Sequence, residues 1–484
     1  MNKKANLSPK ALNTTGKVME ILATPNLGKT TIGMSLNIPE FMTWSMVYND
    51  SNISKEGSND QAAQRELTLS HARGLAEYAL RGMATQHYFD LKDSGKVDKE
   101  IKVLMEYITE IPHAALQPFT CNIRGCNEDG SDLNPQEIEE TLPNGEKRKI
   151  QGIIRITLLQ SKHRLAIVDG QHRRVGFEIL MDFLQTVVRT YKYPKKGLFT
   201  PGNYIADTLI SDVVHDFWKH LLDVSLQECY VKIETHLGLD IQQEKQLYTD
   251  LNLKNKKVSI SQALDYDTSD AVNVFIKDTL IKGGIIKCPI VTKDSKIWNE
   301  DDGSIVRKDL NPITCIAMFG HRQTSKISTH DINQRSSSGI KFWETVQLIK
   351  DFGSNRSRER TVAAQAVVLK GLARLHWELS YGKNKDVNEL TKLHKMVTSG
   401  KLDFSHGNKV WRSLINYNEN TIKKNHPGIE NYVFVKSGTN LDAGTYSNNW
   451  VRYGSKHNDI YPRIGDLIRF QLKLTPRKQK GFNS

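Results

Sequence analysis

The most constraining feature of the sequence is an apolar run that leads directly into a short polar turn. Leu165-Ala166-Ile167-Val168 is followed by Asp169 and Gly170, and apolar residues then recur at helical spacing over residues 175–188. Such a run is typical of a buried strand, and a 3.6-residue period is typical of an amphipathic helix. The segment therefore predicts a strand, a tight turn and a helix. Residues 153–160 predict a second strand that pairs with the first like a hairpin.

The turn and the first helical residues form a candidate site for a phosphate or a nucleotide. The N-terminus of a helix carries partial positive charge and favours an anion. Gly170 lets the backbone approach the ligand closely, and Gln171 supplies hydrogen bonds. His172 can donate to a phosphate oxygen or move a proton near neutral pH. Arg173 can bind phosphate with two parallel hydrogen bonds, and Arg174 adds further positive charge.

Asp169 admits three interpretations that the pattern alone leaves open. Its carboxylate could cap the helix, bind a nucleotide-associated Mg²⁺, or act as a base that activates water. Asp250 and Asn252 could join Asp169 around a metal, although an Asp-x-Asn pair more often caps or turns the chain.

The segment Gly28-Lys29-Thr30 has two interpretations, a phosphate-binding loop or the end of a hairpin turn. A phosphate loop needs a glycine five residues before Gly28, where this chain has Ala23. Residues 18–22 and 30–36 both show strand character on either side of the turn-forming residues 25–28. We therefore expect a hairpin.

The remaining pattern divides the chain into three expected regions: 1–267 around the strand-turn-helix segment, a mixed connection over 268–330, and a mainly helical region over 331–484. Residues 339–352 and 361–381 predict long helices in the last region. Residues 127–149 are acidic and rich in turn formers, so we expect a disordered loop there.

Bulk composition limits the class of protein and of partner. A chain of 484 residues exceeds the size at which one core stops growing. A net charge of +13 favours a polyanion, with nucleic acid first. No apolar stretch is long enough to span a membrane, and residues 1–17 lack the apolar core of a secretory signal, so we expect a cytoplasmic protein. Of five cysteines, Cys121 and Cys126 have a metal-like spacing, without a second close pair.

Two basic clusters outside the turn are candidate DNA contacts. Each cluster could neutralise backbone phosphates, although a solvated helix end or loop is the more common role of such a cluster. The clusters are Lys254, Lys256 and Lys257, and Arg356, Arg358 and Arg360.

Asp169-Gly170-Gln171-His172-Arg173 reproduces in full the DGQHR motif, and in this the chain resembles the DGQHR group of DndB-like proteins that accompany DNA phosphorothioation. Residues 65–67 and 247–252 are also similar to segments of that family, so the resemblance spans residues 22–266. The motif is similar as well to the phosphate-binding corner of the ParB and sulfiredoxin superfamily, which implies an α+β fold. Sulfiredoxins carry a reactive cysteine where this chain has Gln171, so their sulfur-repair chemistry is not expected.

The resemblance implies a DNA-binding accessory or regulatory protein of a DNA-modification or phage-defence system, with a nucleotide and Mg²⁺ as the implied cofactors. Its implied partners are DNA and other proteins of that system, and self-association is left open. The alternative is an NTP-dependent DNA nickase or nuclease in which Asp169 and His172 take part in hydrolysis and Arg173 stabilises phosphate charge. A scaffold for partner proteins is a third hypothesis.

Overall fold

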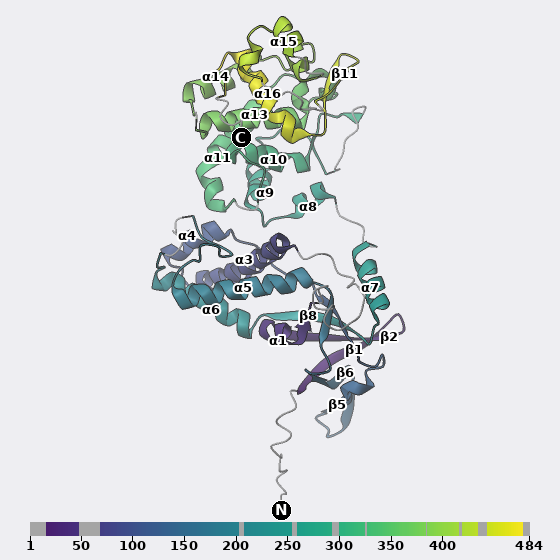
Figure 1. The fold of residues 1–484 in the computed structure, drawn as a ribbon. Coiled ribbons are helices and arrows are strands. Elements are labelled where there is room, and N and C mark those ends of the chain that lie inside the picture. Colours follow the sequence, from purple (N-terminus) through teal and green to yellow (C-terminus); the bar gives the residue numbers. More distant parts are fainter. Residues whose placement is uncertain are drawn as a thin grey trace, which may run out of the picture. The chain divides into compact units, whose positions relative to one another are not determined.

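The computed structural model describes residues 16–47, 68–202, 208–253, 259–292, 300–324, 327–383, 385–415, 419–433 and 443–477 (Figure 1). The chain forms two compact units, residues 1–257 and residues 258–484, which are called here the N-terminal unit and the C-terminal unit. Helices and strands are mixed and the main sheet is large, so the α+β prediction is confirmed.

Among the described residues, the N-terminal unit contains one sheet of eight strands in the order β3-β7-β4-β8-β2-β1-β6-β5. Neighbouring strands are antiparallel except for the pairs β3–β7 and β4–β8, which are parallel. The strands are β1 (Gly16–Asn26), β2 (Lys29–Asn37), β3 (Ser45–Met46), β4 (Phe119–Ile123), β5 (Gln136–Thr141), β6 (Lys147–Leu159), β7 (Leu165–Asp169) and β8 (Tyr230–Leu237).

The predicted hairpin near the N-terminus is confirmed. Strands β1 and β2 are antiparallel, and Asn26 pairs with Lys29 across a two-residue turn. Leu27 and Gly28 both have positive φ angles, 49° and 86°, as the tight hairpin turn requires at both central positions. Lys29 therefore begins a strand, and the interpretation as a phosphate-binding loop is wrong.

The expected pairing of the two central strands is also wrong. Strand β6 lies between β1 and β5, whereas β7 lies between β3 and β4, so four strands separate two segments that are neighbours in the sequence. The physical reason is burial. The first four residues of β7 are all buried, which suits a strand covered on both faces, whereas β6 alternates between exposed and partly buried residues over most of its length.

Residues 127–149 are ordered, which contradicts the expectation of a disordered loop. They form a 3-10 turn, η2 (Ser131–Leu133), then the edge strand β5 and the first residues of β6. Acidic side chains on β5 face basic ones on β6, and Arg148 contacts Glu140 at 2.6 Å while Lys149 contacts Glu137. These cross-strand ion pairs explain why an acidic segment forms a strand instead of a loop.

A group of long helices covers the sheet of the N-terminal unit. Helices α3, α4, α5 and α6 pack against one another beside the sheet (Figure 1). Trp218 on α6 is fully buried at the centre of this layer, where its indole meets the ring of Phe183 edge to face. The helices are α1 (Ile38–Trp44), α3 (Leu69–Asp93), α4 (Lys99–Ile108), α5 (Gln171–Thr190), α6 (Asp212–Gln227) and α7 (Ile241–Leu253).

The C-terminal unit is mainly helical, and this includes residues 331–484, for which the sequence predicts a mainly helical region. Its core surrounds α13, which packs against α10 and α16. The helices of eight or more residues are α10 (Arg307–Phe319), α11 (Thr329–Gln347), α13 (Ala366–Ser380), α14 (Val387–Thr398) and α16 (His457–Leu472). The shorter elements are α8 (Ile260–Tyr266), α9 (Ala271–Phe275), the π-helical turn η3 (Ile276–Ile281), β9 (Ile290–Val291), β10 (Ile305–Val306), α12 (Ser357–Arg360), η5 (Val362–Ala364), η6 (Lys409–Leu414), α15 (Glu419–Asn425), η7 (Ile429–Asn431), β11 (Gly444–Ser447) and β12 (Trp450–Tyr453).

The two predicted long helices of this unit exist with different starts. Helix α11 begins at Thr329 instead of residue 339, because Ser328 and Asp331 form a capping box in which each side chain accepts from the other's backbone N–H. Helix α13 begins at Ala366 instead of residue 361, after the short turn η5. No helix within the described parts of the chain is both long enough and apolar enough to cross a membrane.

Candidate functional site: the corner between strand β7 and helix α5

The DGQHR residues form the corner at which β7 ends and α5 begins. Asp169 is the last residue of the strand, Gly170 makes the turn, and Gln171 opens the helix. Gly170 has a φ of 111°, and a Cβ atom added there would lie 2.5 Å from Cδ1 of Phe119. Only glycine fits this position without strain, both for the backbone angle and for the space. The predicted strand, turn and helix are therefore confirmed.

Arg173 acts as a brace inside this corner. Its guanidinium forms an ion pair with Asp169, and its Nη1 donates to the carbonyl oxygens of Gln117 at 2.6 Å and Pro118 at 2.9 Å. The same guanidinium lies over the ring of Phe119, 4.9 Å from its centroid. Only 11% of the Arg173 side chain is exposed. The arginine therefore ties the end of β7 to the chain that enters β4.

Asp169 is not the cap of α5, so that interpretation is wrong. The N-cap position is Gly170, which has no side chain, and the carboxylate of Asp169 accepts from Arg173 instead. The remaining two interpretations, a metal ligand or a base, stay predictions.

Arg174 is also engaged, on the other side of the corner. Its Nε donates to Oγ of Ser45 at 2.9 Å, its Nη2 donates to the carbonyl of Met42 at 3.3 Å, and its Nη1 pairs with Glu178 at 2.6 Å. These contacts join the first turn of α5 to α1 and β3. Arg174 thus holds the edge strand beside β7.

His172 connects the corner to the start of α3. Its Nε2 accepts a hydrogen bond from the backbone N–H of Thr68 at 3.1 Å, so in the neutral ring the proton is on Nδ1. The ring also meets that of His71 edge to face, with centroids 4.9 Å apart. Gln171, which precedes it, is buried. The corner residues therefore contact α1, α3, β3 and the two residues that precede β4.

The residues suggested for a metal lie on separate elements. Asp250 is in α7, where its carboxylate accepts from Gln246 at 2.8 Å, and Asn252 donates to the carbonyl of Tyr248 at 2.9 Å within the same helix. Within the described part of the chain, no three His, Cys, Asp or Glu side chains gather as a metal site would require. The metal role of Asp169 and Asp250 remains a prediction.

Cys121 and Cys126 lie at and just after β4, and burial raises the pKa of both thiols, that of Cys126 to about 12. Both are therefore protonated at neutral pH. The zinc interpretation of their spacing stays a prediction.

One buried network near the corner has no signal in the sequence. Glu244 on α7 accepts from Asn122 at 2.7 Å and from both Nε and Nη2 of Arg124, at 2.9 and 2.6 Å. Glu244 is almost completely buried, and its three donors satisfy the carboxylate. The network attaches α7 to β4, beside β7, and it depends on residues that are more than a hundred positions apart.

The second basic cluster belongs to the C-terminal unit, around the short helix α12. The side chains of Arg356 and Arg360 are 65% and 53% exposed, and each lies near one acidic residue, Glu359 at 2.6 Å and Asp351 at 3.7 Å. Arg358 is anchored through its backbone, which donates to Asp301 and accepts from His406. Lys254, Lys256 and Lys257 lie outside the described residues.

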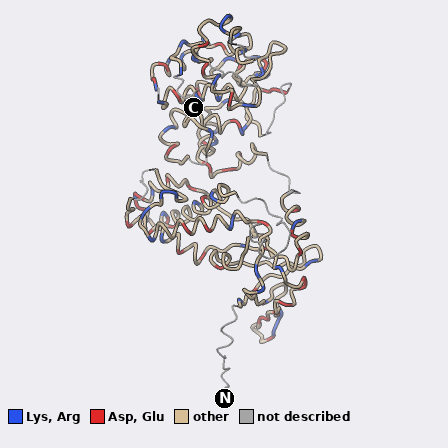
Figure 2. The backbone as a smooth tube through the Cα atoms, viewed as in Figure 1, with Lys and Arg blue, Asp and Glu red and all other residues tan. Residues whose placement is uncertain are grey.

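Charge divides unequally between the two units. Residues 1–257 contain 32 Lys and Arg and 32 Asp and Glu, whereas residues 258–484 contain 35 basic and 22 acidic residues. The entire net charge of +13 therefore belongs to the C-terminal unit. Figure 2 shows that basic and acidic residues are interleaved along both units, so the difference is one of number and not of one continuous basic stripe.

Comparison with known proteins gives one match. No curated protein and no solved structure matches the chain. The family model DndB, described as DNA-sulfur modification-associated, matches residues 45–435, which is most of both units and extends far beyond the span of 22–266 suggested by the motif. The chain therefore belongs to the DndB family of proteins associated with DNA sulfur modification.

Proposed function

We propose that this chain is a DNA-binding accessory and regulatory protein that acts in the cytoplasm within a DNA sulfur-modification system. Membership of the family gives the role in such a system. The observation that carries the finer proposal is the charge of the C-terminal unit, which has 35 basic residues against 22 acidic ones. A protein that neutralises phosphates releases condensed counterions, and this release drives association with DNA regardless of sequence.

The DGQHR corner is proposed as a phosphate contact of a different kind. Arg173 and Arg174 are held by protein partners, so the positive end of helix α5, with its 20 residues, is the part of the corner that favours an anion. A phosphate that bound Arg173 directly would have to compete with the carboxylate of Asp169. A nucleotide with Mg²⁺ as the ligand, and a role in phage defence or in transcriptional control, belong to the same proposal.

The alternative of a nickase or nuclease makes a different demand on Asp169. A hydrolase needs this carboxylate to hold a metal or to activate water, and its turnover would be lost on substitution by asparagine. A binding protein does not need the negative charge. The ion pair between Asp169 and Arg173 supports the role of a binding protein, because it gives the carboxylate a structural partner.

The test combines DNA binding with a search for turnover. Binding of the full chain to duplex DNA is measured at several salt concentrations, and hydrolysis of ATP, CTP and GTP with Mg²⁺ is followed with and without DNA, together with a gel assay for nicking. We expect salt-dependent binding without turnover. Asp169→Asn is expected to bind DNA at least as tightly as the natural chain, because it removes a negative charge beside the helix N-terminus.

The outcomes separate the hypotheses. DNA-stimulated hydrolysis or nicking that disappears in Asp169→Asn would replace the binding role with the enzyme. A chain with no affinity for DNA at low salt would leave only the role as a scaffold for partner proteins. Sedimentation of the same samples reports self-association directly.

A further inference from the structure

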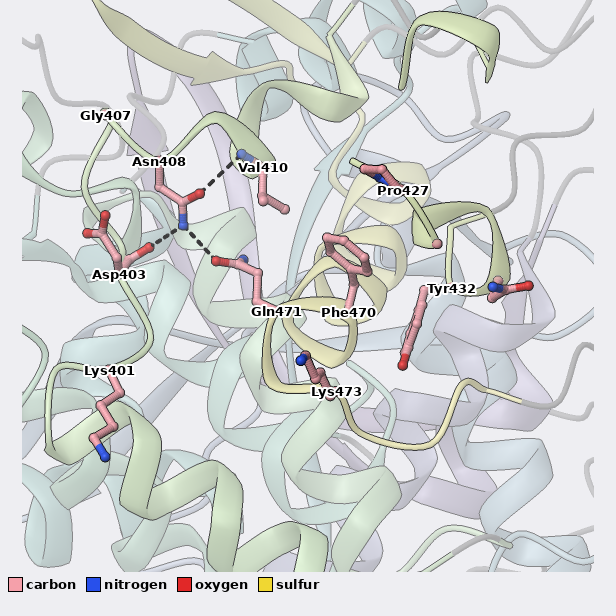
Figure 3. Close-up of a pocket in the computed structure, with 12 residues that line it drawn as sticks. Lys401, Asp403, Gly407, Asn408, Val410, Pro427, Tyr432, Phe470, Gln471 and Lys473 are labelled. Carbon is pink, nitrogen blue, oxygen red and sulfur yellow. Dashed lines mark hydrogen bonds between the residues drawn. The ribbon is translucent and has the colours of Figure 1, made fainter. Parts of the chain in front are cut away.

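The C-terminal unit contains an open pocket far along the chain from the DGQHR motif. The pocket has a volume of about 740 Å³ and lies between the last turn of α16 and the segments that carry η6 and η7. Pockets that bind small ligands commonly have volumes of several hundred Å³. Figure 3 shows aromatic rings, amides, lysines and the carboxylate of Asp403 around it.

The aromatic side of the pocket consists of Phe470 and Tyr432. Their rings meet edge to face with centroids 5.6 Å apart, so each ring fixes the orientation of the other. Both side chains are half-buried and line the pocket. Half-buried rings at a pocket surface offer a flat apolar face on which a planar ligand stacks.

The amide side of the pocket is held in one orientation by its own hydrogen bonds. Asn408 donates to the backbone carbonyl of Asp403 at 2.8 Å and to Oε1 of Gln471 at 2.6 Å, and its Oδ1 accepts from the N–H of Val410 at 3.1 Å. Oε1 of Gln471 is thereby used as an acceptor. Its Nε2 is buried and has no hydrogen-bond partner among the described residues, so this amide shapes the wall of the pocket without offering an accessible donor.

The lysines give the pocket a positive charge. Lys401 and Lys473 are exposed and line the pocket, and neither forms an ion pair with a carboxylate in the described structure. The acidic residue of the lining, Asp403, is occupied locally, because its carboxylate accepts from the backbone N–H and the hydroxyl of Ser405 at 2.8 and 2.9 Å. Two lysines against one carboxylate leave the lining with a net positive charge, which favours an anionic ligand.

We propose that this pocket binds a nucleoside phosphate unit. The base stacks on the face of Phe470 beside the ring of Tyr432, which lies edge to face with it, and the phosphate lies near Lys473 and Lys401. The same chemistry is found in a free nucleotide and in an unstacked nucleotide of single-stranded DNA. The site goes beyond the proposed function, because DNA attraction through net charge needs no pocket.

The experiment measures binding of AMP, adenosine, ribose 5-phosphate and a short adenine single strand to the full chain by calorimetry. Stacking on an aromatic ring contributes about 1–3 kcal/mol per base, so Phe470→Leu is expected to weaken AMP by about tenfold. Lys473→Gln is expected to weaken AMP about threefold and to reduce its salt dependence. Lys350→Gln, an exposed lysine of the same unit outside the pocket lining, is the control and should bind like the natural chain.

A comparison of the affinities for AMP and for the adenine single strand shows which kind of nucleotide the pocket binds. Single-stranded DNA that binds more tightly than AMP, with the gain lost in Phe470→Leu, assigns the pocket to a nucleotide within a strand. Equal affinities assign it to a free nucleotide. Both results support the proposal, and duplex binding that persists in Phe470→Leu keeps the proposed function separate from it.

Three results would overturn the proposal. They are equal binding of ribose 5-phosphate and AMP, unchanged AMP affinity in both pocket variants, and no AMP binding at millimolar concentration. If Phe470→Leu unfolds, as a thermal melt would reveal, Tyr432→Leu replaces it with the same expected loss.

Discussion

The two units of this chain share one family match and differ in charge and construction. The N-terminal unit contains equal numbers of acidic and basic residues, and its DGQHR corner is tied by short contacts to four neighbouring elements. The C-terminal unit has the whole net charge of +13, and one of its pockets combines aromatic rings with lysines that form no ion pair in the described structure. The residues of the motif are therefore mainly structural in their contacts, and the excess of positive charge belongs to the other unit.

The difference shows that a sequence motif and an electrostatic attraction need not coincide. Arg173 is part of the motif, yet its donors reach a carboxylate and two backbone carbonyls. Arg356 and Arg360 belong to no motif, but more than half of each side chain is exposed. Long-range attraction depends on the sum of charges over a unit, whereas a tight corner depends on a few short contacts.

The largest expected effect concerns the corner itself. Gly170→Ala places a Cβ atom 2.5 Å from Phe119 at a φ of 111°, so we expect the free energy of unfolding to fall by about 3 kcal/mol or more. Gly28→Ala is the matched control, because Gly28 also has a positive φ, 86°, but no atom lies within 4 Å of the added Cβ. Its cost should be about 1 kcal/mol. Equal losses in chemical denaturation would show that Phe119 leaves room at the corner.

The second prediction concerns the buried interior of the C-terminal unit. Burial lowers the pKa of His376 to about 3 and that of His394 to about 4, and His376 Nδ1 lies 3.2 Å from His394 Nε2. Because the folded pKa values lie below the ordinary 6.5, the unfolded chain binds more protons as the pH falls. The contribution of these two histidines to the free energy of unfolding is therefore fully present above pH 6.5. Below this pH it decreases by up to about 1.4 kcal/mol per pH unit for each histidine.

Asp466 opposes this trend in part, because burial raises the pKa of its carboxyl group to about 6. Its contribution to the free energy of unfolding is therefore present at low pH and is lost as the pH rises through this value. His394→Asn should remove one histidine's share of the slope between pH 6.5 and 5, measured by urea unfolding. His321→Asn, at an exposed position in the same unit, should leave the slope unchanged. A slope that His394→Asn does not alter would contradict the assignment to the buried pair.

The smallest expected effect tests which unit attracts DNA. The double variant Arg356→Gln and Arg360→Gln should weaken duplex binding several-fold and reduce the slope of log affinity against log salt by about 2, one phosphate contact for each arginine. Arg148→Gln with Lys149→Gln, an exposed pair with acidic partners in the N-terminal unit, should change neither quantity. The opposite result would transfer the DNA contact to the β5–β6 hairpin.

Local pattern was sufficient for several parts of the fold. The buried run 165–168, the glycine at 170 and the helical period after it predicted β7, the turn and α5, and the turn residues around Gly28 predicted the first hairpin. These elements follow from neighbours in the chain, namely side-chain periodicity and a backbone angle that glycine favours. The net positive charge of the chain can likewise be counted from the sequence without a structure.

Long-range pairing was beyond the reach of that pattern. The sequence pattern predicted that β6 pairs with β7, whereas four strands separate them in the sheet. Strand pairing depends on which faces become buried in the folded chain, and a local pattern does not contain this information. The sequence pattern also predicted a loop over residues 127–149, because it could not show that the acidic strand β5 pairs with basic residues of β6.

The sequence therefore determined the local elements, the DGQHR segment and the total charge of this protein. The tertiary structure decided what the motif residues contact: Asp169 and Arg173 hold each other, and Arg173 also holds the carbonyls of Gln117 and Pro118. It also brought Phe470, Tyr432 and Asn408 together around one pocket. The physical reason is the range of the interactions, because periodicity and charge are properties of neighbouring residues or of their sum. A hydrogen bond or a stacking surface needs atoms that only the folded chain brings within a few ångströms.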